Sequence, residues 1–139
     1  MIRTLRDDEL AWANERYQAI EFAASPPGTF GLVAEQAGDR VALGRLVTLE
    51  PGVIELGGIW TDERVRGRGL AREIVTALIA HGGATRLWCL PFAHLAAFYE
   101  SFGFVRAEPP WPAGVAAKLS ACASHPIPTG VVQLREPTR

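Results

Sequence analysis

The sequence predicts a mixed α/β (α+β) fold, with one mostly antiparallel central sheet of about six to seven strands and three to four helices. Seven segments are short, apolar and bounded by turn residues, as strands are, while three or four others carry apolar residues at helical spacing. The second to fourth strand segments follow one another across tight turns, which predicts an antiparallel meander. The 139 residues suffice for one core, so we expect residues 1–139 to form a single domain.

The first half of the chain is predicted to contain four strands and one helix. Asp7 or Asp8 is expected to cap a helix over residues 11–22, where apolar side chains recur at helical spacing. Residues 37–39 and 50–52 place glycine beside polar residues or proline, the composition of hairpin turns. The predicted strands are residues 2–6, 30–36, 41–48 and 53–61.

The second half is predicted to alternate helices and strands. An amphipathic helix is expected over residues 69–80, ended at residues 81–83 by a glycine in the left-handed conformation. A second short helix spans residues 95–102, and the proline-rich segment 109–130 contains a further helix near residues 115–123. The predicted strands are residues 85–90, 104–107 and 131–135.

The charge balance and the cysteine count exclude several classes of protein. The net charge is −1, so no general attraction to nucleic acid or to anionic membranes is expected. No stretch approaches the roughly 20 apolar residues of a membrane helix, and the N-terminus lacks the apolar core of a signal peptide. Cys89 and Cys122 are too few for a disulfide framework and are not in metal-ligand spacing. We therefore expect a cytoplasmic, metal-free protein whose two thiols are small core residues.

A basic, glycine-rich loop stands between the fourth strand and the following helix. Amides at a helix start lack partners within the helix, and the helix dipole adds partial positive charge there, so this loop is suited to bind an anion. Gly67 and Gly69 permit backbone conformations that other residues avoid. The loop matches neither the dinucleotide fingerprint nor the P-loop, and a solvated arginine-rich turn is the alternative interpretation. Its basic residues are Arg64, Arg66, Arg68 and Arg72.

Two segments of this chain resemble motifs of the GNAT family of N-acetyltransferases. The run Arg64-Val65-Arg66-Gly67-Arg68-Gly69 resembles that family's Gln/Arg-x-x-Gly-x-Gly/Ala signature, and residues 97–104, AFYESFGF, resemble its helix-to-strand segment. The order of elements along the whole chain also matches. The resemblance implies an acyl-CoA N-acyltransferase fold and transfer of acetyl from acetyl-CoA to an amine, by direct attack in a ternary complex. It implies a small-molecule or protein amine as the acceptor, and the protein as a monomer or homodimer.

The resemblance also implies where the cosubstrate binds. The loop amides would hold the CoA pyrophosphate, and the pantetheine arm would pair with the strand at residues 58–61. Gly57 and Gly58 are a plausible site for a β-bulge, after which the N–H of Ile59 or Trp60 would stabilise the thioester oxyanion. Close packing is the alternative explanation for the two glycines. The expected cofactor-binding residues are Ile59, Trp60, Thr61, Arg64, Arg66, Gly67, Arg68, Gly69, Leu70 and Ala71.

Two residues are candidates for the proton transfers. Tyr99 matches the family tyrosine that protonates the leaving thiolate, although its apolar surroundings in sequence also suit a core tyrosine. Glu55 lies on the cofactor strand, where the family often places a glutamate base, or it is a solvent-facing strand residue. His94 and His125 are weaker candidates for the base. No sequence motif lowers the pKa of either cysteine, so an acyl-enzyme is not expected.

Some features depart from the family pattern and keep other functions open. Phe92 stands where many members have an asparagine that contacts the cofactor, and the usual second helix is reduced or absent. A non-catalytic CoA-binding module of the same fold is therefore a second hypothesis. A basic loop that contacts RNA or DNA is a third, disfavoured by the neutral net charge.

The acceptor is not encoded in either motif. Its site should be built from the segments that cover the cleft, namely the helix near Tyr17, residues 25–29 and residues 109–130. Trp60 and Trp111 are candidates to line an apolar acceptor pocket.

Overall fold

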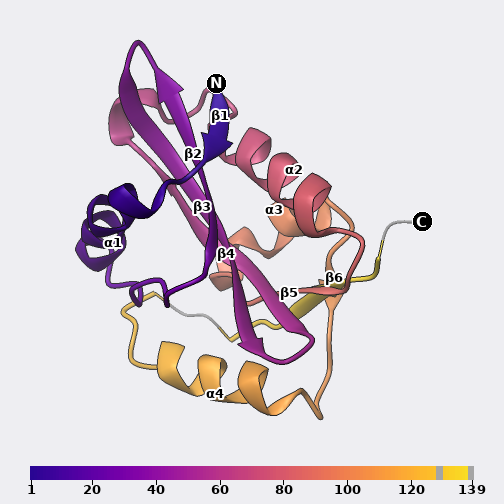
Figure 1. The fold of residues 1–139 in the computed structure, drawn as a ribbon. Helices are drawn as coiled ribbons and strands as arrows, with labels where there is room; N and C mark the ends of the chain where they lie inside the picture. Colours follow the sequence, from indigo (N-terminus) through magenta and orange to yellow (C-terminus); the bar gives the residue numbers. More distant parts are fainter. Residues whose placement is uncertain (128–129, 138–139) are drawn as a thin grey trace. The chain divides into compact units, whose positions relative to one another are not determined.

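The computed structural model describes residues 1–127 and 130–137, which form a seven-stranded sheet with the strand order β1-β2-β3-β4-β5-β7-β6 (Figure 1). Together with four α-helices in these residues, this confirms the predicted fold class. The chain packs into two compact units. Unit 1 contains Met1–Val47 and Gly58–His81, and unit 2 contains Thr48–Gly57 and Gly82–Arg139.

The elements have the following bounds. The strands are β1 (Ile2–Thr4), β2 (Phe30–Gln36), β3 (Asp39–Glu50), β4 (Val53–Thr61), β5 (Leu87–Cys89), β6 (Val105–Arg106) and β7 (Gln133–Arg135). The α-helices are α1 (Leu10–Ala19), α2 (Leu70–Gly82), α3 (Ala96–Glu100) and α4 (Ala113–Cys122). Single turns of 3₁₀-helix are η1 (Asp7–Glu9), η2 (Glu63–Val65) and η3 (Ala93–Leu95). The predicted elements are all present, and the strands in the second half are shorter than expected.

Unit 1 is built on the antiparallel pairs β1–β2 and β2–β3. Successive side chains of β3 point to opposite faces of the sheet, and a different helix of unit 1 packs against each face. On one face, Leu43 packs with Ala13 and Tyr17 of α1 in a buried cluster. On the other face, a Cβ atom at Gly44 would overlap the side chain of Ile74, so glycine here allows α2 to lie close against β3.

The first helix of unit 1 begins differently from the prediction. Neither aspartate caps it, so that expectation was wrong. Instead, the Arg6 amide donates to Glu9 Oε1 at 3.0 Å, and the Glu9 amide donates back to Arg6 O at 3.0 Å. Glu9 is buried and ion-paired with Arg3 and Arg40, and the Arg3 hydrogen bonds hold the pKa of its carboxyl at about 2. The longer carboxylate of Glu9, at the third position of the turn, satisfies the Arg6 amide, which leaves the aspartates in solvent.

Two further expectations concern the segment after α1 and the C-terminal end of α2. No helix forms between α1 and β2, in residues 20–29, so the reduced second helix is confirmed for this segment. The expected left-handed cap at residues 81–83 is wrong, because neither glycine there has a positive φ. The carbonyl of Gly82 instead accepts bonds from the Thr85 amide at 3.2 Å and from its hydroxyl at 3.0 Å.

Unit 2 contains the parallel pair β4–β5 and the antiparallel pairs β5–β7 and β6–β7. Cys89 and Gln133 lie opposite each other across β5 and β7, so their side chains share one face. Gln133 Nε2 donates to Ala96 O at 3.2 Å, so α3 covers that face. The alternate residue Trp88 projects from the other face and packs with Val115 of α4. Tyr99 and Glu55, the two catalytic candidates of unit 2, lie on these two faces, one on each.

Candidate active site

The basic loop of unit 1 joins β4 to α2 through η2, as the sequence predicted. Gly67 and Gly69 have φ values of +80° and +81°, in the left-handed region that side chains avoid. A Cβ atom at either position would have no neighbour within 4 Å. Glycine is therefore required here by the backbone conformation, while packing imposes no constraint. Such a conformation turns successive amides toward one side, as in backbone anion sites.

The amides of residues 67–71 have no protein acceptor among the residues that the structure describes. The first helical bond of α2 runs from the Glu73 amide to Gly69 O at 3.1 Å, so the preceding amides at the helix start stay open. These donors, the exposed loop and the positive end of the helix dipole fit an anionic group such as a pyrophosphate.

The loop arginines are not equivalent. Asp62 accepts hydrogen bonds from the Arg64 amide at 2.9 Å, from its Nε at 3.0 Å and from its Nη2 at 2.8 Å. These bonds hold the pKa of the Asp62 carboxyl at about 2, so the pair stays charged at ordinary pH. Arg66 lies 3.8 Å from Glu63, whereas Arg68 is exposed and makes no ion pair with the described residues. Arg68 is thus the loop cation most available to a ligand.

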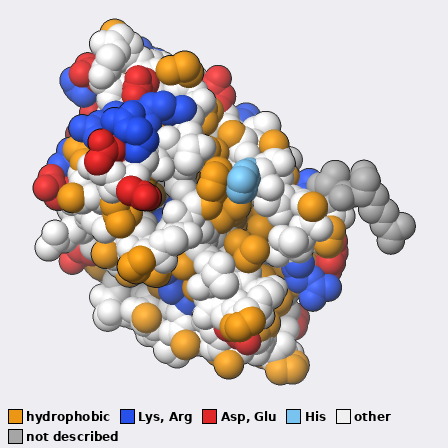
Figure 2. All heavy atoms as spheres, in the orientation of Figure 1, with side chains coloured by type: hydrophobic (Ala, Val, Ile, Leu, Met, Phe, Trp, Pro, Cys, Tyr) orange, Lys and Arg blue, Asp and Glu red, His pale blue; other side chains and the backbone are white. Residues whose placement is uncertain are grey.

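The surface carries no uniform basic field. On the face shown in Figure 2, basic and acidic side chains lie interspersed. The described residues contain no cluster of three His, Cys, Asp or Glu side chains placed to hold a metal ion, and none of their helices is long and apolar enough to span a membrane.

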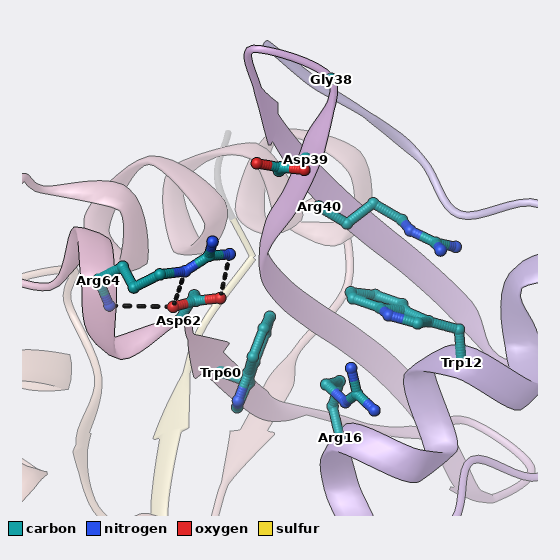
Figure 3. A pocket seen from close by; sticks show the side chains of 8 residues that line it. All are labelled: Trp12, Arg16, Gly38, Asp39, Arg40, Trp60, Asp62 and Arg64. Carbon is teal, nitrogen blue, oxygen red and sulfur yellow. Dashed lines mark hydrogen bonds and ion pairs between the residues drawn. The ribbon is translucent and has the colours of Figure 1, made fainter.

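A polar pocket of about 270 Å³ lies beside the loop within unit 1 (Figure 3). Trp60 of β4 faces Trp12 of α1 edge-on, with ring centroids 5.8 Å apart. The Arg40 guanidinium covers the Trp12 ring at 4.2 Å. Trp60 therefore lines a pocket, but a charged one, and the expectation of an apolar pocket is wrong for it. The full lining is Trp12, Arg16, Gly38, Asp39, Arg40, Trp60, Asp62 and Arg64.

Sequence reasoning missed most of this lining. Trp12 and Arg16 lie one turn apart on α1, and that i, i+4 spacing was the available signal. Trp111, the other tryptophan expected at an acceptor pocket, instead packs in the core of unit 2, and its Nε1 donates to Ala107 O at 3.0 Å. Of the segment 109–130 that was expected to cover the acceptor, residues 128 and 129 lie outside the described residues.

The backbone of β4 leaves regular strand geometry at Gly58, whose φ is +60°. The Tyr17 hydroxyl donates to Gly58 O at 2.8 Å. A Cβ atom at Gly58 would lie 2.9 Å from the Tyr17 hydroxyl and 2.7 Å from Arg45 Nε. The irregularity that the two glycines predicted is therefore present, and close approach also demands glycine here. Among the described residues, β4 pairs with β5 only at Ile54 and Glu55, although β4 continues to Thr61.

Tyr99 of α3 is 5% exposed, with its ring against Phe98 and Phe104. Its hydroxyl makes no hydrogen bond with the described residues, yet it is not among their fully enclosed polar atoms. Burial raises the pKa of Tyr99 well above its usual value, and the nearby Cys89 and Glu55 raise it further. The hydroxyl is thus a neutral proton donor on a fixed ring.

Glu55 is buried, with a side chain 10% exposed, so the alternative of a solvent-facing residue is excluded. Lys118 Nζ of α4 lies 3.6 Å from Glu55 Oε1. Because Glu55 is paired with Trp88 across β4 and β5, it projects from the face that α4 covers. Tyr99 belongs to α3 on the other face. The two candidates for proton transfer therefore approach the sheet from opposite sides.

The remaining candidates of unit 2 are less suited to catalysis. His94 and His125 both pack against the ring of Phe92, at centroid distances of 5.9 and 5.0 Å. Phe92 is the N-cap residue of η3 and offers no polar atom where the family has an asparagine. Burial raises the pKa of the thiols of both Cys89 and Cys122, which opposes a thiolate nucleophile.

Comparisons with known proteins agree on the fold. The chain superimposes on Rv2747 from Mycobacterium tuberculosis, solved in complex with CoA, with a TM-score of 0.75 and 19% identity over 99% of both chains. The ribosomal-protein-S18-alanine N-acetyltransferase of Escherichia coli matches with a TM-score of 0.70 and 20% identity, over 100% of this chain and 94% of that one.

The N-acetylglutamate synthase of Neisseria gonorrhoeae, complexed with CoA and L-arginine, gives a TM-score of 0.74 and 15% identity. This chain is covered completely there but spans only 33% of that protein. No curated protein sequence matches significantly. A profile described as the acetyltransferase (GNAT) family matches residues 1–104, which is most of the chain and includes the loop and the Tyr99 segment. This protein belongs to the GNAT family of acetyltransferases.

Proposed function

We propose that this protein is an acetyl-CoA-dependent N-acetyltransferase, with residues 1–139 acting as one catalytic domain. The observation that carries the proposal is the row of open amides at residues 67–71, between two left-handed glycines and the start of α2. An anionic group is the natural partner of such a row. Acetyl-CoA carries a pyrophosphate and supplies the activated acetyl group.

The residues proposed to hold the cosubstrate lie in two adjoining segments. Gly67, Gly69 and the start of α2 at Leu70 and Ala71 provide backbone donors, and Arg68 adds a charge-assisted donor. Asp62 holds the Arg64 side chain, and Thr61 O accepts a hydrogen bond from Arg66 Nε. These two arginines are therefore proposed to orient the loop as well as to bind the cosubstrate. The backbone of Ile59, Trp60 and Thr61 is proposed to pair with the pantetheine arm, and an amide of Ile59 or Trp60 to polarise the carbonyl.

Two side chains are proposed to move protons. Glu55, directly or through water, takes a proton from the attacking amine. The Tyr99 hydroxyl gives its proton to the departing thiolate, since burial keeps that hydroxyl neutral. Their positions on opposite faces of the sheet support separate roles, because the attacking amine and the departing thiolate lie on different sides of the reacting carbon. The acceptor is an amine, and we expect the reaction in the cytoplasm, since neither Cys89 nor Cys122 is in a disulfide.

Isothermal titration with acetyl-CoA and CoA tests the first half of the proposal, and CoA release across a panel of amines tests the second. We expect micromolar binding and turnover of at least one amine class. Binding without turnover of any amine would favour the non-catalytic CoA-binding module, which the apolar Phe92 keeps as the second candidate. Absence of binding would overturn both.

A further inference from the structure

Arg45, in the middle of β3, is buried with only 5% of its surface exposed. No carboxylate forms an ion pair with it among residues 1–127 and 130–137. A buried charge without a counter-ion is costly, so such a residue marks a candidate functional site. By contrast, two arginines of the polar pocket are already neutralised, Arg40 by Glu9 and Arg64 by Asp62.

The contacts of Arg45 fix the Nη1 side of its guanidinium and leave Nε and Nη2 without a hydrogen-bond partner among the described residues. Its Nη1 donates to Ala23 O at 3.0 Å and to Ser25 Oγ at 2.8 Å, and the group stacks on the Tyr17 ring at 4.2 Å. The Ser25 amide in turn donates to Asn14 Oδ1 at 2.9 Å, which anchors this segment to α1. Nε and Nη2 make no hydrogen bond with the described residues, yet neither is fully enclosed.

The edge formed by Nε and Nη2 has the paired donors that a carboxylate needs. Nε and Nη2 are parallel donors on one side of the planar group, and they match the two oxygens of a carboxylate. Because stacking and the Nη1 bonds already hold the guanidinium, little rotamer entropy remains to be lost on binding. The edge also lies beside the irregular part of β4, since Nε is 2.7 Å from the Cβ position of Gly58.

We propose that Arg45 binds the carboxylate of a free amino-acid acceptor and so selects amino acids among amines. This inference rests on the proposed acetyltransferase function and names its acceptor class. The α-amino nitrogen forms the new N–C bond with the acetyl carbon, the C–S bond breaks, one proton leaves the amine for the base, and the thiolate takes one proton. The products are an N-acetylamino acid and CoA.

The test compares each of the standard L-amino acids with its own α-amide as acceptor, using the full chain and saturating acetyl-CoA. The α-amine of an amino-acid amide has a lower pKa than the α-amine of the free acid, so a larger fraction of it is unprotonated and able to attack. A preference for the acids therefore cannot come from amine protonation. We expect kcat/KM to be higher for the acid than for the amide of the best acceptor by roughly 100-fold, as for a desolvated charge pair. Equal values for acids and amides would overturn the inference.

Variants assign the preference to this side chain. In Arg45→Met and Arg45→Lys, KM for the amino acid should rise, while KM for acetyl-CoA and the rate with amides stay unchanged. The lysine variant keeps a charge but loses the paired donors, and it stays informative if the methionine variant fails to fold. Arg86→Met, at an exposed arginine paired with Glu136, is the matched control and should change neither constant.

The outcomes separate this inference from the proposed function. If acetyl-CoA binds and amines without a carboxylate are acetylated equally well, the inference fails and the acetyltransferase stands. If the Arg45 variants lose activity equally toward acids and amides, Arg45 is only a structural link between β3 and residues 23–25, and the inference fails again. If no amine is acetylated at all, the proposed function itself has failed.

Discussion

The loop of residues 62–71 in unit 1 and the Tyr99–Glu55 pair in unit 2 solve different physical problems. The loop is exposed, and its donors are backbone amides fixed by two left-handed glycines. Tyr99 and Glu55 are buried side chains, and burial raises the pKa of Tyr99 above its usual value. We therefore propose that binding of the donor and transfer of protons are separable in this protein. Substitutions in the loop should change affinity, and substitutions in the pair should change rate.

The largest effect is expected at Tyr99. Tyr99→Phe keeps the buried ring and removes a hydroxyl that bonds to none of the residues described by the structure, so the fold should be retained. Loss of the general acid should lower kcat by about 10³-fold, with the acetyl-CoA Kd unchanged. Steady-state kinetics and calorimetry measure the two. An unchanged kcat would remove Tyr99 from the chemistry.

The dependence of kcat on pH in the wild type also tests the role of Tyr99 as the general acid. A general acid must be protonated, and burial raises the Tyr99 pKa above its usual value near 10. Ionisation of Tyr99 should therefore produce no alkaline fall in kcat up to pH 10. A fall that begins below pH 10 and disappears in Tyr99→Phe would contradict the buried, neutral hydroxyl.

The next effect is expected at Glu55. Glu55→Gln should lower kcat by about 10²-fold, because the base is lost. Lys118→Met removes the ion-pair partner and keeps the carboxylate, so it should retain most of kcat. Equal losses of stability and of kcat in the two variants would show that Glu55 is only half of an ion pair.

A smaller effect is expected in the loop. Gly69→Ala disfavours the φ of +81°, which costs about 1–2 kcal/mol, and should weaken acetyl-CoA binding by roughly 10-fold with kcat preserved. Gly52→Ala is a matched control, since Gly52 has the same φ and equally open surroundings in the β3–β4 turn. Equal affinities in the two variants would mean that the loop does not bind the donor.

The smallest effect separates two arginines of the loop. Arg68→Gln should weaken acetyl-CoA binding about 3-fold, as expected for one exposed charge contact, and the loss should shrink as salt rises. Arg64→Gln should have less effect, because Asp62 already holds that guanidinium. Calorimetry at two salt concentrations measures both. A larger loss at Arg64 would reverse this ranking of the loop donors.

Sequence patterns located the loop and Tyr99 because both depend on local order. Glycines at fixed spacing before an amphipathic helix determine where backbone donors lie, whatever the rest of the chain does. The position of Glu55 was predicted, but its burial was not, since a single glutamate in a strand is compatible with either face. The capping aspartates were predicted wrongly, because the partners of Glu9 include Arg40, 31 residues away in the sequence.

The sequence by itself determined the mixed sheet, the meander and the glycine-rich loop at the start of α2, because hydrophobic period, turn chemistry and helix-start chemistry act over a few residues. Only the tertiary structure decided that Tyr99 and Glu55 belong to opposite faces of the sheet, and that Arg45 is buried beside Gly58 with no ion-pair partner in the part of the chain that the structure describes. Burial and charge pairing depend on contacts between residues far apart in the chain, and no local sequence pattern predicts which of these residues will be in contact.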